Sequence, residues 1–128
     1  MDGEGGDVWA AQQVLKALDY GFLPQRAFKL FNDNYFVEVL DLGMLLRNDK
    51  AVTRYKGRII GSEGKAKKAL EELSDAYIAV SGNSVVLIGT FEDLRDVKQA
   101  IMLLLEGATN HSVFAFLERR NKQKRMLR

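Results

Sequence analysis

Three glycines within eight residues place the strongest constraint on how this chain can fold. They are Gly57, Gly61 and Gly64. Apolar residues recur at three- and four-residue steps on both sides, from Ala51 to Ile59 and from Ala66 to Leu73, which predicts two helices. Two glycines only two residues apart allow a tight turn and leave no side chain to cover it. The sequence therefore predicts two helices joined by a bare turn that a ligand can approach closely.

The charge order of the second predicted helix favours a docked anion. Its first turn holds Lys65, Lys67 and Lys68, and its second turn holds Glu71 and Glu72. This order opposes the helix dipole, which favours acids at the start of a helix and bases at its end. Stability alone does not select such an order, whereas an anion docked at the helix start does.

The charges of the whole chain are strongly polarised. Its formal net charge is only +2, but residues 54–68 and 116–128 together hold twelve bases against two acids. The other hundred residues hold seven bases against fifteen acids. Such a distribution indicates a localised anion-binding face, although basic runs also occur as ordinary solvated surface.

Several classes of site are excluded by composition and spacing. The chain of 128 residues has no cysteine and one histidine, His111, so thiol catalysis, iron–sulfur clusters, cysteine-ligated zinc and histidine metal clusters are ruled out. The glycine spacing fits neither a dinucleotide-binding nor a Walker loop, and Ala66 offers no hydroxyl to magnesium. We therefore expect no catalytic residue, metal or cofactor. No apolar run has the length of a membrane span or a signal peptide.

The remaining segments predict an α+β domain. Strands are expected at 36–42, 77–80 and 85–88, with a loop at 43–49 and a hairpin turn at Gly82-Asn83. A long helix should follow from Phe91 to Leu105, and a final helix from His111 or Ser112 should fray at its basic end. A sheet of only three strands needs helices packed on one face.

The first 34 residues predict a helical hairpin. One helix should begin at Asp7 and stop at Gly21, and Pro24 should open a second one. Trp9 is expected to anchor this hairpin. The apolar positions expected to face inward are Val8, Ala11, Val14, Leu15 and Leu18 on the first helix, and Ala27, Phe28, Leu30 and Phe31 on the second.

The segment Ile60-Gly61-Ser62-Glu63-Gly64 resembles the I-G-x-x-G loop of type I KH domains, and the order of elements from about residue 35 to 107 fits that fold. This resemblance implies a loop that clamps about four nucleotides of single-stranded RNA beside an apolar groove. The RNA-binding residues that it implies are Gly57, Arg58, Ile60, Gly61, Ser62, Glu63, Gly64, Lys65, Lys67, Lys68 and Val80, with Glu71 as a further candidate.

A closer resemblance covers nearly the whole chain. The patterns G-R-I-x-G-x-x-G-K-x-K, from Gly57, and L-x-x-G-A, from Leu104, are similar to the second KH domain of the Partner-of-Nob-One or Dim-Two family of archaea and eukaryotes. This resemblance implies binding near the 3′ end of small-subunit (pre-)rRNA. It also implies a PIN-domain endonuclease and translation initiation factor two alpha as partners. The implied location is the cytoplasm, or the nucleolus or nucleus if the protein is eukaryotic.

The resemblance divides the chain into an N-terminal helical extension (1–34), a KH domain (35–107) and a C-terminal basic helix (108–128). Family members carry a first KH domain upstream, where this chain has only the hairpin. The opening residues MDGEGGD are therefore also compatible with a fragment of a longer protein.

Ser62 and Glu63 depart from the pattern of many RNA-binding KH loops, because an acid that faces phosphate weakens binding. Two hypotheses follow. The first is a non-enzymatic, single-stranded RNA-binding module. The second is a degenerate KH domain that acts as a protein adaptor for a ribosome-assembly or translation factor.

Overall fold

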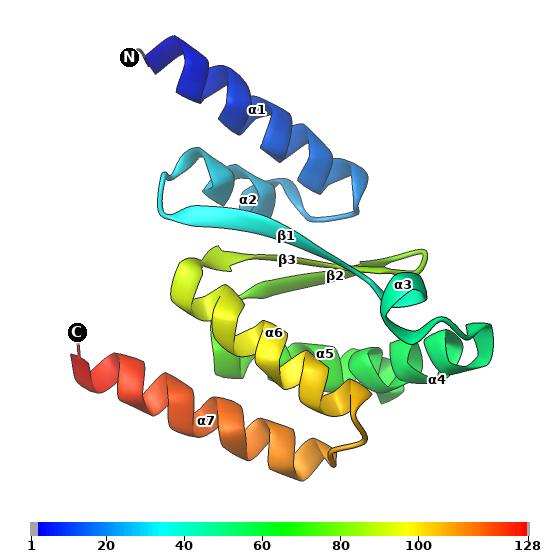
Figure 1. The fold of residues 1–128 in the computed structure, drawn as a ribbon. Coiled ribbons are helices and arrows are strands. Elements are labelled where there is room, and N and C mark those ends of the chain that lie inside the picture. Colours follow the sequence, from blue (N-terminus) through cyan, green and yellow to red (C-terminus); the bar gives the residue numbers. More distant parts are fainter. Residues whose placement is uncertain (1–2, 128) are drawn as a thin grey trace.

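The computed structural model describes residues 3–127 and confirms an α+β fold around a three-stranded antiparallel sheet (Figure 1). The strands are β1 (Tyr35–Asp41), β2 (Tyr77–Ser81) and β3 (Ser84–Thr90), arranged in the order β1-β3-β2. The helices are α1 (Gly3–Asp19), α2 (Pro24–Ala27), the 3-10 helix η1 (Phe28–Phe31), α3 (Leu42–Leu46), α4 (Asp49–Ile60), the 3-10 helix η2 (Ser62–Gly64), α5 (Lys65–Ser74), α6 (Phe91–Leu105) and α7 (Asn110–Leu127). Within residues 3–127, every helix is too short or too polar to cross a membrane.

Helices cover both faces of the sheet (Figure 1). The larger core joins one face to α4, α5 and α6, with α7 packed behind α5 and α6. The smaller core joins the other face to the N-terminal hairpin of α1, α2 and η1. The sequence predicts the first layer and the hairpin, but it does not predict that the hairpin covers the second face.

The central strand β3 explains this arrangement. Val85, Val86, Leu87 and Ile88 are all fully buried, and successive side chains alternate between the two cores. Side chains of neighbouring strand residues point to opposite faces, so four consecutive apolar residues need cover on both. The hairpin supplies the second cover.

The expected inward face of the hairpin is partly wrong. Val14, Ala17, Phe22, Ala27 and Leu30 are buried against the sheet. By contrast, the side chains of Val8, Trp9, Leu15, Phe28 and Phe31 are each more than half exposed. Two features account for the difference: α1 contacts the rest of the molecule along a narrow stripe, and after Ala27 the helix tightens to 3-10 geometry. That geometry aligns residues three apart, so Phe28 and Phe31 lie together on the outer side.

The segment expected to be a loop at 43–49 contains the short helix α3. Asp41 ends β1 one residue before the expected boundary, and its Oδ1 accepts a hydrogen bond from the Met44 amide at 3.1 Å. This side chain caps the start of α3 and stops the strand.

The expected fraying of the last helix is also wrong. α7 runs to Leu127, and its Lys124 is buried with only 6% of its surface exposed. Lys124 Nζ lies 2.7 Å from Asp93 Oδ1 on α6 and donates to the Ser74 carbonyl of α5 at 3.3 Å. The basic end of α7 is therefore fixed to the domain, and Lys124 does not belong to an exposed basic face. The last of the twelve bases, Arg128, lies outside the described residues.

Candidate nucleic-acid interface

The turn between α4 and α5 has the tight geometry that the glycines predict. Gly61 ends α4 with φ 76° and ψ 175°, and Gly64 precedes α5 with φ 75° and ψ 12°. The conformation of Gly61 is essentially restricted to glycine, whereas that of Gly64 is left-handed helical.

The two glycines have different neighbours. A Cβ atom added to Gly61 would lie 2.6 Å from the Ala66 Cβ and 2.7 Å from the Ala66 amide nitrogen. A Cβ atom added to Gly64 would meet nothing within 4 Å. Gly61 therefore allows α5 to pack closely against the turn, and Gly64 keeps the outer side of the turn open to a ligand.

Ser62 and Glu63 form the exposed tip of the turn. Glu63 has φ 56°, a left-handed conformation that is uncommon for a residue with a side chain. The Gly64 amide donates to the Gly61 carbonyl at 3.2 Å, and the Lys65 amide donates to the Ser62 carbonyl. Hydrogen bonds within the turn thus occupy two of the backbone amides that could otherwise bind an anion. Attraction of an anion to the turn therefore depends more on the adjoining lysines.

The three lysines lie in the first turn of α5. Lys65 and Lys68 are exposed, while Lys67 is half-buried with its Nζ 3.6 Å from the Glu71 carboxylate. The exposed pair is free to approach a phosphate beside the turn.

Arg58 is held inside the protein more tightly than the sequence suggests. Its guanidinium donates to the Ala108 carbonyl at 2.6 Å, to the Leu104 carbonyl at 3.3 Å and to the Asn110 side chain at 3.2 Å. These bonds satisfy carbonyls at the end of α6 and fix the start of α7. Its neighbours Gly57 and Ile60 are exposed and half-buried, respectively, on α4.

Val80 lies on the open edge strand β2. A two-residue turn joins β2 to β3, with Ser81 opposite Ser84 and Val80 opposite Val85. Because bonding alternates along such a pair, the main chain of Ile78 and Val80 points away from β3. The Ile78 amide already donates to Glu71 Oε2 at 2.8 Å. Val80 therefore marks the part of the edge where a base can still reach main-chain groups.

Predicted and unpredicted residues meet in one pocket of about 450 Å³. Lys67 and Val80, both predicted, line it together with Tyr20, Leu23 and Arg26 of the N-terminal hairpin. The sequence gives no local signal for the hairpin residues, because Arg26 and its partner Glu71 are 45 residues apart. Arg58 is not among the residues that line this pocket.

The comparison with protein families decides the identity of this unit. A model of the second KH domain of PNO1, described as a eukaryotic-type KH domain (KH-domain type I), matches residues 36–122. The chain belongs to this family. The resemblance to the Partner-of-Nob-One or Dim-Two family is thereby confirmed, and the matched region extends from β1 through most of α7.

Known proteins agree with this KH assignment. A KH domain-containing protein of Methanocaldococcus jannaschii is 40% identical over 119 residues, or 92% of this chain and 52% of the relative. A protein of unknown function from Aeropyrum pernix matches with a TM-score of 0.85 and 36% identity, over 92% of this chain and 63% of that chain. A chain in the a/eIF2alpha-aDim2p-rRNA complex from Pyrococcus horikoshii matches with a TM-score of 0.82 and 37% identity, over 91% of this chain and 63% of that chain.

The chain therefore spans about half the length of the curated relative and less than two thirds of the two solved chains.

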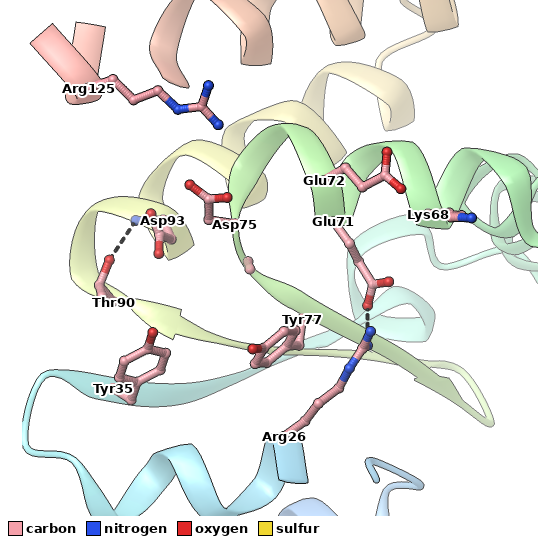
Figure 2. Close-up of a pocket in the computed structure, with 11 residues that line it drawn as sticks. Arg26, Tyr35, Lys68, Glu71, Glu72, Asp75, Tyr77, Thr90, Asp93 and Arg125 are labelled. Atoms are coloured by element: carbon pink, nitrogen blue, oxygen red, sulfur yellow. Dashed lines mark hydrogen bonds and ion pairs between the residues drawn. The ribbon is translucent and has the colours of Figure 1, made fainter. Parts of the chain in front are cut away.

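A second, larger pocket of the KH domain has a different chemistry. It measures about 620 Å³ and extends along α5 from Lys68, in the first turn of the helix, past the helix end to Asp75 (Figure 2). Its lining includes four carboxylates, from Glu71, Glu72, Asp75 and Asp93. Arg26, Lys68 and Arg125 also line this pocket. Its four carboxylates nevertheless oppose the entry of a nucleic-acid backbone, because they repel phosphates. Among residues 3–127, no group of three acids or histidines has the arrangement of a metal site.

Proposed function

We propose that this KH domain binds single-stranded RNA at the 3′ end of small-subunit (pre-)rRNA and assists its processing as a binding module without catalytic chemistry of its own. The open side of Gly64, next to the exposed Lys65 and Lys68, is the observation that carries this proposal. A matching chain occurs in a solved complex that contains rRNA, which supports the choice of RNA.

The groove residues have assigned roles in this proposal. The turn from Gly61 to Gly64 approaches the sugar-phosphate chain, and Lys65, Lys67 and Lys68 neutralise phosphates. Gly57, Ile60 and Val80 border the bases. Arg58 contributes mainly by holding the ends of α6 and α7, since its guanidinium already donates to three protein oxygens.

The test is fluorescence anisotropy with a short single-stranded RNA that matches the 3′ end of small-subunit rRNA. Gly64→Asp is compared with Gly64→Asn, because both side chains tolerate the left-handed conformation and only one adds a negative charge. We expect the Asp variant to lose at least about tenfold more affinity than the Asn variant, because a carboxylate placed directly against a phosphate is a like-charge contact, which costs several kcal/mol at an interface. Lys50→Glu, at the opposite end of α4, is the control for a remote change of charge.

Salt dependence gives a second measure. Neutralisation of two or three phosphates predicts a slope of log K against log salt of about −1.4 to −2.1 for wild type, at about −0.7 per phosphate on single strands. Equal affinity of both Gly64 variants together with a flat salt response would refute the phosphate clamp.

Translation initiation factor two alpha is proposed as a partner, because a/eIF2alpha is part of the solved complex that contains a matching chain. The PIN-domain endonuclease is proposed on the family resemblance alone. Binding of either purified protein that survives Gly64→Asp, in the absence of RNA binding, would favour the adaptor hypothesis over the RNA clamp.

A further inference from the structure

The pocket between the N-terminal hairpin and the edge of the KH groove has the chemistry of a nucleotide site. It is lined by Tyr20 and Leu23 at the joint between α1 and α2, by Arg26 on α2, by Lys67 on α5 and by Ile78 to Val80 on β2. No carboxylate is among its lining residues, in contrast to the pocket of Figure 2. An aromatic ring beside two cations is the combination that single-stranded nucleic-acid sites use to stack bases and attract phosphate.

An ion pair separates the two pockets. Arg26 Nη1 lies 2.8 Å from Glu71 Oε2, as the dashed line in Figure 2 marks, and the same oxygen accepts the Ile78 amide at 2.8 Å. The Arg26 guanidinium also lies over the Tyr77 ring, at 4.6 Å from its centre. This cluster lies at the start of β2, beside Tyr77 and Ile78. An RNA strand that runs along the edge of β2 past Val80 therefore reaches the hairpin pocket. The Arg26–Glu71 pair and the carboxylates beyond it would oppose its continuation toward Tyr77.

We propose that the hairpin joint binds one nucleotide of the RNA beyond the four held in the KH groove, with its base against Tyr20 and its phosphate on the pocket side of Arg26 and Lys67, the two cations that Glu71 Oε2 contacts at 2.8 Å and 3.6 Å. This inference rests on the proposed function and adds a subsite in which Tyr20 and Arg26 lie outside the segment that the KH family model matches, whereas Lys67 lies within it. The volume of about 450 Å³ lies in the range of ligand pockets.

The experiment compares RNAs of four and six nucleotides with a common core sequence, by anisotropy at fixed salt. Wild type should bind the longer RNA more tightly, and Tyr20→Ala should abolish that gain, a loss of about fivefold to 100-fold in affinity for the longer RNA given the strength of base–aromatic stacking. The affinity of Tyr20→Ala for the shorter RNA should remain that of wild type. Tyr20→Phe should keep the gain, because the stacking face is preserved.

Two further measurements keep the test decisive if Tyr20→Ala disturbs the hairpin. Leu15→Ala removes an exposed side chain of α1, 62% accessible, and controls for changes in the hairpin away from the pocket. In the wild-type protein, 2-aminopurine placed at each position of the six-nucleotide RNA should show quenching at one position outside the four-nucleotide core, and Tyr20→Phe should preserve it.

The outcomes separate the two proposals. If wild type binds neither RNA, the proposed function itself is wrong. If it binds both RNAs with equal affinity, or if Tyr20→Ala weakens both equally while its fold is intact, the RNA clamp stands and the hairpin subsite is refuted.

Discussion

At the scale of single residues, the two glycines of the turn are predicted to respond differently to the same substitution. Gly61→Ala would force a Cβ against the Ala66 amide and Cβ in a conformation restricted to glycine. We expect a loss of about 2–6 kcal/mol in the free energy of unfolding, from backbone strain and overpacking together. Gly64→Ala has open space and should lose only about 1–2 kcal/mol. Urea denaturation of both variants measures the difference, and equal losses would contradict the proposed division of roles.

A consequence for experiment follows from this difference. Any Gly61 variant changes the fold as well as the binding surface, so a loss of RNA binding by a Gly61→Asp, Gly64→Asp double variant would not isolate the clamp. Gly64 alone gives a clean test, because its Cβ direction is unobstructed.

Glu63 is the acid in the loop on which the RNA-binding and adaptor hypotheses differ. It is exposed at the tip of the turn, where its carboxylate would repel a phosphate docked beside Gly64. We predict that Glu63→Gln raises RNA affinity about 1.5- to fivefold, the strength of one solvent-exposed charge interaction, and that Glu63→Lys raises it further. Anisotropy at low salt measures the gain, and high salt should reduce it. No change in either variant would place this side chain away from the RNA.

At the scale of elements, the sequence predicts the α4–turn–α5 unit, the β2–β3 hairpin and α6 because their signals are local. Helical periodicity, paired glycines and a two-residue turn each act within a few residues. The capped helix α3 is missed since Asp41 reads equally well as the end of a strand. The lysines expected at the start of α5 do lie in its first turn. The bonds of Arg58 to Ala108 and Asn110, however, cross 50 and 52 positions of the chain, and no local pattern predicts them.

The attachment of α7 gives a prediction at this scale. Lys124→Met would leave the buried carboxylate of Asp93, 2.7 Å from Lys124 Nζ, without its cation. It would also remove the second cation of Asp96, 3.8 Å away, which would keep only Arg95. We expect a loss of about 3–5 kcal/mol in the free energy of unfolding, the usual effect of breaking one side of a buried pair. Lys122→Met, exposed on the same helix, should change stability by less than about 0.5 kcal/mol. Thermal and urea denaturation compare the two, and similar stabilities would show that the buried pair does not hold α7 in place.

At the scale of the whole molecule, the hairpin and the KH domain form one folded unit around β3. The sequence predicts both parts but treats the hairpin as an extension, because no pattern within residues 1–34 says which surface it covers. The signal lies elsewhere in the chain: the uninterrupted apolar run Val85 to Ile88 needs cover on two faces, and only the three-dimensional arrangement shows that the hairpin provides the second. The packing of the hairpin on the sheet also brings Tyr20 and Arg26 to the pocket beside β2. No local pattern in the sequence predicts this packing, so the sequence does not predict the place of these two residues either.

Removal of residues 1–34 should therefore destabilise the KH domain rather than leave it intact. It would expose Val86 and Ile88, both fully buried, together with Ala79 on the outer face of the sheet. Loss of cover from these two larger side chains alone would reduce the free energy of unfolding by about 3–6 kcal/mol. The truncated chain should also bind a hydrophobic dye and self-associate, because exposed apolar faces are interaction surfaces. Denaturation, dye fluorescence and sedimentation measure these effects. A truncated chain that stays monomeric and as stable as the full chain would show that the hairpin is a separable extension.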